Sequence, residues 1–143
     1  MACRFSWLIL FTIAPLYACA PPSFEVVPCD VGGKMGFRIA PIEGWFSDYE
    51  PRPTSISVRT TDRQSYERDT VWETELPYNG LENDGFPARP VREFIVYGQK
   101  MSGWEIQQTP KSLTNGQMYL VIVSDGSHSG SAEFKIDKPL SAC

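Results

Sequence analysis

Short runs in which apolar and polar residues alternate dominate the chain after residue 29. The clearest runs span residues 34–39, 55–60, 94–97, 104–107, 118–123 and 132–136. A period of two places successive side chains on opposite faces of a β-strand, so that Met35, Phe37 and Ile39 share one face of the first run. No window of similar length shows the 3.6-residue period of a helix. The pattern therefore predicts an all-β domain.

Turn-forming residues separate these runs. Asn115-Gly116 precedes the run 118–123, and residues 125–130 are expected to join the last two strands as a hairpin. Two runs, 94–97 and 118–123, are apolar on both faces and are predicted to be central, buried strands. A further strand is expected at 70–76. Twelve prolines and eleven glycines fall mostly between the runs, which favours a single small β-sandwich over a helical bundle.

One local motif narrows the type of sandwich. The pattern Leu113-x-x-Gly116-x-x-Tyr119-x-Val121-x-Val123 resembles the tyrosine corner of immunoglobulin-like and fibronectin type III domains. In those domains a tyrosine at the start of the penultimate strand turns its hydroxyl back onto the upstream backbone. The resemblance implies an immunoglobulin-like or fibronectin type III-like β-sandwich with Tyr119 as its corner.

The N-terminus has the layout of an export signal. Arg4 precedes an apolar stretch over residues 5–18, which is too short to cross a bilayer as a helix. The motif Leu16-Tyr17-Ala18-Cys19 that follows resembles the bacterial lipobox. That resemblance implies cleavage before Cys19, diacylglycerol and palmitate-type acyl chains on Cys19, and insertion into the lipid bilayer. Ordinary secretion by cleavage after Ala20 is the alternative, and it is disfavoured because Pro21 would become the first residue.

The residue after the lipidated cysteine indicates whether a bacterial lipoprotein stays in the inner membrane or is moved to the outer membrane. Retention in the inner membrane usually requires Asp there, and Ala20 occupies the position in this chain. The resemblance therefore implies the outer membrane, with the domain facing the periplasm. We predict a signal peptide at 1–18, a lipidated N-terminus and tether at 19–28, and the sandwich at 29–143.

The cysteines support an oxidising compartment. Cys3 leaves with the signal peptide and Cys19 carries lipid, so that Cys29 and Cys143 remain as an even pair. We predict a disulfide between them that ties the two ends of the domain together. Two free buried thiols are the alternative, and a cysteine at the chain terminus is hard to bury.

Catalytic and metal-binding motifs are scarce. The single histidine, His128, lies in the turn 125–130 beside Asp125, Ser127 and Ser129, but members of a catalytic triad normally converge from separate elements. We therefore interpret this turn as a solvated polar loop. One histidine cannot build a zinc site. Carboxylates at positions 62, 69, 73 and 75 are interleaved with Arg63 and Arg68, which indicates a mixed-charge surface.

Aromatic residues in the connection 42–53 are the best candidates for partner binding. Trp45, Phe46 and Tyr49 lie in this Pro- and Gly-rich segment, and loops at the ends of sandwiches often carry recognition. The alternative is that Trp45 or Phe46 closes the end of the core. Trp72 and Trp104 lie in strand patterns and are predicted to be core residues. The segment 77–90 is expected to be an ordered excursion at one end of the sandwich.

A longer C-terminal pattern suggests a family. It comprises Tyr97-Gly98-Gln99-Lys100-x-x-Gly103-Trp104, Pro110-x-x-Leu113-x-x-Gly116-x-x-Tyr119 and Gly130-x-x-x-Phe134-x-Ile136. With the lipobox, it is similar to small bacterial lipoproteins described as type VI secretion immunity periplasmic lipoproteins. These motifs are structural, so the resemblance assigns no contact residues.

Together these features predict a non-enzymatic protein-binding module. Its partner would be a protein, either a secreted toxin in an immunity role or, as the alternative, a component of an envelope or secretion assembly that the lipoprotein supports. The formal net charge of -4 argues against nucleic acid as a partner. We expect no cofactor and no small-molecule substrate.

Overall fold

The computed structural model describes residues 24–42, 50–61, 69–77, 94–137 and 139–143. Within these ranges all regular structure is β-strand. The strands are β1 (Phe24–Asp30), β2 (Met35–Pro41), β3 (Ser55–Thr60), β4 (Thr70–Glu75), β5 (Phe94–Val96), β6 (Glu105–Gln108), β7 (Met118–Ser124) and β8 (Ser129–Lys135).

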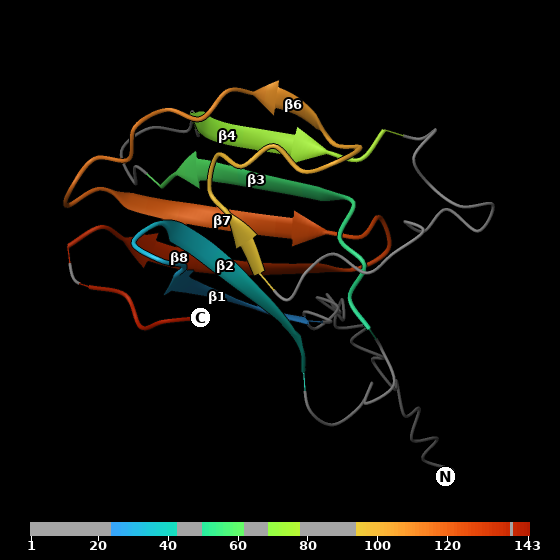
Figure 1. The fold of residues 1–143 in the computed structure, drawn as a ribbon, viewed down its shortest axis with the longest axis horizontal. Coiled ribbons are helices and arrows are strands. Elements are labelled where there is room, and N and C mark those ends of the chain that lie inside the picture. The colour runs from blue at the N-terminus through green and yellow to red at the C-terminus, as the bar shows by residue number, and fades with distance from the viewer. Residues whose placement is uncertain (1–23, 43–49, 62–68, 78–93, 138) are drawn as a thin grey trace, which may run out of the picture.

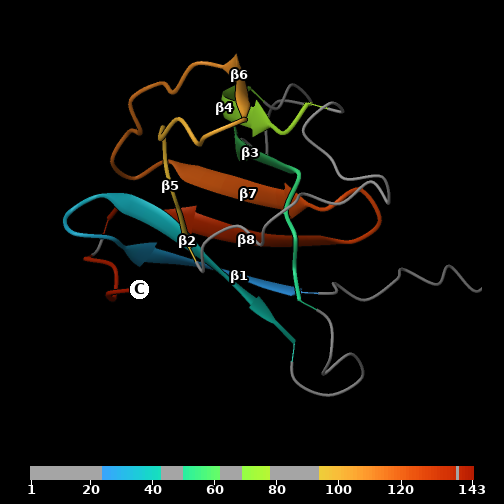
Figure 2. The same cartoon turned by 45° about the vertical axis from the view of Figure 1, so that its right-hand side comes forward.

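The strands form two packed antiparallel sheets (Figures 1 and 2). One sheet has the order β1-β2-β5, and the other has the order β6-β4-β3-β7-β8. The order β1-β2-β5 and β4-β3-β7-β8 is that of a fibronectin type III-like sandwich, and β6 extends the second sheet beyond β4. The predicted β-sandwich is confirmed.

The core lies between the sheets and is built around aromatic rings. Phe37 of β2 meets Phe134 of β8 edge to face, with 5.4 Å between ring centroids, and Phe134 stacks on Tyr119 at 5.5 Å. Trp72 is fully buried and Trp104 is 6% exposed, as predicted for core residues. Period-two alternation produced this core because each strand turns alternate side chains inward.

The predicted tyrosine corner is present at the start of β7. Tyr119 is 2% exposed, and its hydroxyl accepts a hydrogen bond of 2.7 Å from the backbone N–H of Thr114. A second tyrosine, Tyr97, packs edge to face on Trp72 and donates its hydroxyl hydrogen to the carbonyl of Lys111 at 2.7 Å. Burial, followed by the nearby Tyr119, raises the pKa of Tyr97 to about 12, although the bond to Lys111 acts in the opposite direction.

The sandwich begins earlier than predicted. Residues 24–28 were assigned to a tether, but β1 starts at Phe24, which is 1% exposed and faces the core. The cause is the hairpin that joins β1 to β2, whose loop residues Gly32 and Gly33 both have positive φ angles, 62° and 83°. With these angles the two-glycine loop is a type I′ turn, which is typical of a hairpin in which the strand before the turn pairs with the strand after it.

Two strands differ from the prediction in their placement. The segment 94–97 was expected to be a central strand, but β5 is the edge of the three-stranded sheet, since among the described strands it pairs only with β2. The run 118–123 was expected to be buried throughout. In β7 only Tyr119, Val121 and Val123 are buried, and the alternate residues are partly exposed on the outer side of the sheet.

The predicted disulfide between Cys29 and Cys143 is formed, with 5.1 Å between the Cα atoms. The C-terminal segment lies along the end of β1, where the N–H of Asp30 donates to the carbonyl of Ser141 at 2.8 Å and the N–H of Cys143 donates to the carbonyl of Asp30 at 3.0 Å. The last residues of the chain therefore pair with the end of β1.

Candidate functional site

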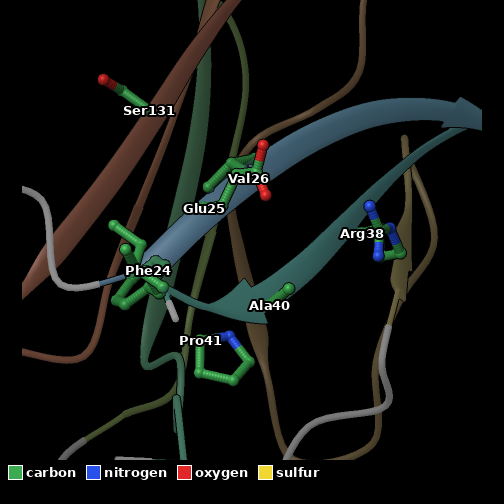
Figure 3. Close-up of a pocket in the computed structure, with 8 residues that line it drawn as sticks. Phe24, Glu25, Val26, Arg38, Ala40, Pro41 and Ser131 are labelled. Carbon is green, nitrogen blue, oxygen red and sulfur yellow. The ribbon is translucent and has the colours of Figure 1, made fainter. Parts of the chain in front are cut away.

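The end of the β1–β2 pair carries an open hollow of about 630 Å³ (Figure 3). β5 pairs with β2 only at Gly36, Phe37 and Arg38, whereas β1 pairs with β2 as far as Pro41. Within the described residues, the last part of β2 therefore has a strand neighbour on one side only, which leaves this end of the sheet open.

The lining of the hollow combines apolar and charged side chains. Glu25 pairs with Ala40 and Arg38 pairs with Val27, so that Glu25 and Arg38 are diagonal neighbours on the outer face of the hairpin. Both are exposed. The full lining comprises Phe24, Glu25, Val26, Arg38, Ala40, Pro41, Ile42 and Ser131, from β1, β2 with the residue after it, and β8.

Close packing of β1 on β8 forms one wall of the hollow. A Cβ atom built on Gly130 would lie 2.5 Å from the carbonyl oxygen of Phe24 and 2.7 Å from its ring. Glycine at this position therefore allows the first residue of β1 to cross β8 in contact with its backbone. Phe24 fills the gap between the two sheets here, and Ser131 follows on the rim.

Ile42 makes this end distinctive. It follows β2 directly and is 39% exposed, which makes it an exposed large apolar side chain beside a carboxylate and a guanidinium. Such a combination can accept an apolar side chain of a partner and bond to polar groups around it. The predicted binding residues Trp45, Phe46 and Tyr49 lie outside the described residues, as does the lipidation site Cys19. The excursion 77–90 lies outside them except for Pro77.

The histidine turn has a structural explanation. The carboxylate of Asp125 accepts hydrogen bonds from the backbone N–H groups of Ser127 and His128, at 3.0 and 2.7 Å. Asp125 is only 3% exposed, so the prediction of a solvated loop is wrong for this residue. The acid holds the hairpin loop in shape, and the His128 ring lies beside it with Nδ1 at 3.4 Å from Oδ2.

The acidic residues of β4 are placed on an outer sheet surface. Glu73 and Glu75 alternate with the buried Trp72 and Thr74, and the side-chain amide of Gln107 donates to Glu75 at 2.7 Å. Among the described residues, no group of three or more His, Cys, Asp and Glu side chains could hold a metal ion. In the same ranges there is no helix long and apolar enough to cross a membrane.

Sequence reasoning missed the hollow because it placed residues 24–28 in the tether. The signal that could have located it is Gly32-Gly33, since a two-glycine hairpin loop predicts strands on both sides. The alternation of Phe24, Glu25 and Val26 would then have placed Glu25 on the outer face. Comparisons with protein-family models, curated proteins and solved structures gave no match to this chain.

Proposed function

We propose that this protein is a lipid-anchored periplasmic lipoprotein of the bacterial outer membrane that binds a protein partner without catalysis, in the role of an immunity protein against a secreted toxin. The observation that carries the binding proposal is the hollow at the β1–β2 end. There, Ile42 is exposed beside Glu25 and Arg38, immediately before the aromatic segment with Trp45, Phe46 and Tyr49.

The proposed anchor is close to this end of the domain. Five residue steps separate Cys19 from Phe24, so a fully extended tether spans at most about 18 Å. The start of β1 therefore lies near the membrane if Cys19 carries lipid. A partner bound at the hollow is then held close to the bilayer surface.

The binding proposal is tested by capture from cells. The full chain is crosslinked in cells challenged with toxin-bearing neighbours, and captured proteins are identified for the wild type, Ile42→Ser and Arg38→Glu. Both variants should lose the partner. Lys34→Glu is the matched control, because Lys34 is an exposed basic residue at the other end of the same hairpin.

The same experiment separates the two predicted roles. Recovery of a toxin, together with loss of survival on gene deletion, supports the immunity role. Recovery of a native envelope complex in unchallenged cells supports the accessory role instead. Equal capture by the wild type and both hollow variants would remove the hollow as the binding site.

The anchor has its own test. Cys19→Ser should abolish labelling by a fatty-acid analogue and release the protein from membranes. The control is Cys3→Ser, which lies in the segment that signal cleavage removes and should leave labelling unchanged. Labelling that persists in Cys19→Ser would overturn the lipid assignment.

A further inference from the structure

The outer surface of the five-stranded sheet carries an apolar stripe that the core does not use. In β7, Tyr119, Val121 and Val123 point into the sandwich, so Met118, Leu120 and Ile122 point outward, where they are partly exposed. The register places small or charged residues of β3 and β8 on both sides of this stripe. We call this surface, over β3, β7 and β8, the β7 face.

The two sides of the stripe differ in charge. Arg59 of β3 and Glu133 of β8 both pair with Leu120, one on each side, so they occupy the same row of the β7 face. Two strand spacings, about 10 Å, separate their backbones. Within the described part of the chain neither residue forms an ion pair, and the Nε atom of Arg59 is buried without a hydrogen-bond partner.

We propose that a second copy of this chain binds the β7 face, which forms a symmetric dimer with its two-fold axis along β7. This axis lies between the facing five-stranded sheets of the two copies. Rotation about it places the β3 side of one copy over the β8 side of the other. Since Arg59 and Glu133 share a row, Arg59 of each copy then lies over Glu133 of its partner. Both pairs form at once, as a two-fold interface requires.

The remaining positions fit the same arrangement. On the axis, the apolar stripe of one copy faces that of the other. In the neighbouring row, Ser57 and Ser131 flank Ile122, and in the next row Ser55 and Ser129 flank Ser124. Ser55, Ser129 and Ser131 would lie at the interface beside Ser57, which is only 7% exposed, and the small size of these serines permits the sheets to approach to the usual 10 Å. No like charges meet in these rows.

The size of the face sets the strength of the dimer. Three strands of up to seven residues make a flat patch of roughly 340 Å², which is smaller than the roughly 800 Å² per partner of stable interfaces. The dimer is therefore weak and reversible in solution. Confinement of both copies to one membrane, under the proposed anchoring, would raise their effective concentration.

Charge reversal tests the proposal because the pairs cross between copies. Arg59→Glu creates two Glu–Glu contacts in a homodimer, and Glu133→Arg creates two Arg–Arg contacts. Each variant alone should raise the dissociation constant at least about tenfold. An equimolar mixture of the two variants restores both attractive pairs and should form a heterodimer with wild-type affinity.

The measurement is sedimentation equilibrium of the purified full chain in density-matched detergent over a wide concentration range. Arg38→Glu and Glu25→Arg are the matched controls, since they make the same charge changes on the other sheet and should dimerise like the wild type. Leu120→Asp places two carboxylates on the axis and should be monomeric. This variant replaces a charge-reversal variant in the test if the charge reversal prevents folding. A wild type that stays monomeric throughout, or a variant mixture that does not associate, overturns the proposal.

Discussion

Loss of the Cys29–Cys143 bridge should be the most destabilising single change outside the core. The two cysteines are 114 positions apart, and the loop that the bridge closes contains every described strand from β2 to β8. The loop-entropy relation gives about 5 kcal/mol at 25 °C for a loop of this length. The total unfolding free energy of a small domain is about 5–15 kcal/mol, so the bridge accounts for a third of this stability or more.

The C-terminal segment contributes beyond the loop term. Two backbone hydrogen bonds, of 2.8 and 3.0 Å, join Asp30 to Ser141 and Cys143. They remain available in Cys143→Ser, but the segment that makes them is exposed and would no longer be held in place by a covalent bond. We therefore expect Cys143→Ser to lose about 4–6 kcal/mol, with the upper part of this range including frayed hydrogen bonds.

Urea unfolding followed by tryptophan fluorescence measures this loss, since Trp72 and Trp104 are buried in the core and report its exposure. The wild type and the variant are compared by their unfolding free energies extrapolated to water, because removing a cross-link also changes how steeply the unfolding free energy falls with urea concentration. Reductant should bring the wild type to the stability of Cys143→Ser and leave that variant unchanged. Ser141→Ala, which keeps the bridge, is the control.

A loss below about 1 kcal/mol would refute this reasoning, because the 114-position loop alone predicts several times more. It would mean that the bridge does not form, or that the unfolded chain is already constrained. Titration of free thiols in the folded protein separates these two explanations.

Three further changes test other parts of the fold. Tyr119→Phe should cost about 0.5–1.5 kcal/mol of unfolding free energy, because the backbone N–H that bonds its hydroxyl loses a partner. Gly130→Ala should cost about 1–3 kcal/mol, since the new methyl group would overlap Phe24, whereas Ser131→Ala on the exposed side should have little effect. The pKa of Tyr97, about 12, exceeds the ordinary 10, so stability should be complete below pH 10, fall as the pH rises from 10 to 12, and show no such fall in Tyr97→Phe.

Most strands after β1 could be predicted from the sequence because they depend on local signals, and the disulfide because only Cys29 and Cys143 remain once Cys3 and Cys19 are assigned to the signal peptide and the lipid. Alternation in 55–60 placed β3 within its observed bounds, since Ile56 and Val58 must share the buried face. The turn at 125–130 located the last hairpin, although β8 begins at Ser129 rather than at 132. Polar residues at 129–131 hid that start, because alternation there is between serine and glycine.

The hollow and the β7 face could not be predicted from local signals, since both depend on which strands are neighbours. The hollow is lined by residues of the β1–β2 hairpin and of β8, which are far apart in the sequence, and no local pattern shows that the start of β1 crosses β8. Apolar residues on both sides of β7 suggest burial from sequence alone. The register shows instead that Leu120 lies between Arg59 and Glu133 on an outer surface.

The position of the disulfide gains a further meaning from the proposed anchor. Among the described strands β1 pairs with β2 alone, and its free side is bonded to the C-terminal segment only at Asp30. Any pull from a tether at residues 19–23 enters the domain through Phe24. Five residues after Phe24, Cys29 is bonded to the end of the segment that follows β8 in the other sheet. The covalent bond therefore links the tethered strand to both sheets. Reduction should make β1 the first strand to exchange its amide hydrogens, because edge strands open at lower free energy than strands in the middle of a sheet.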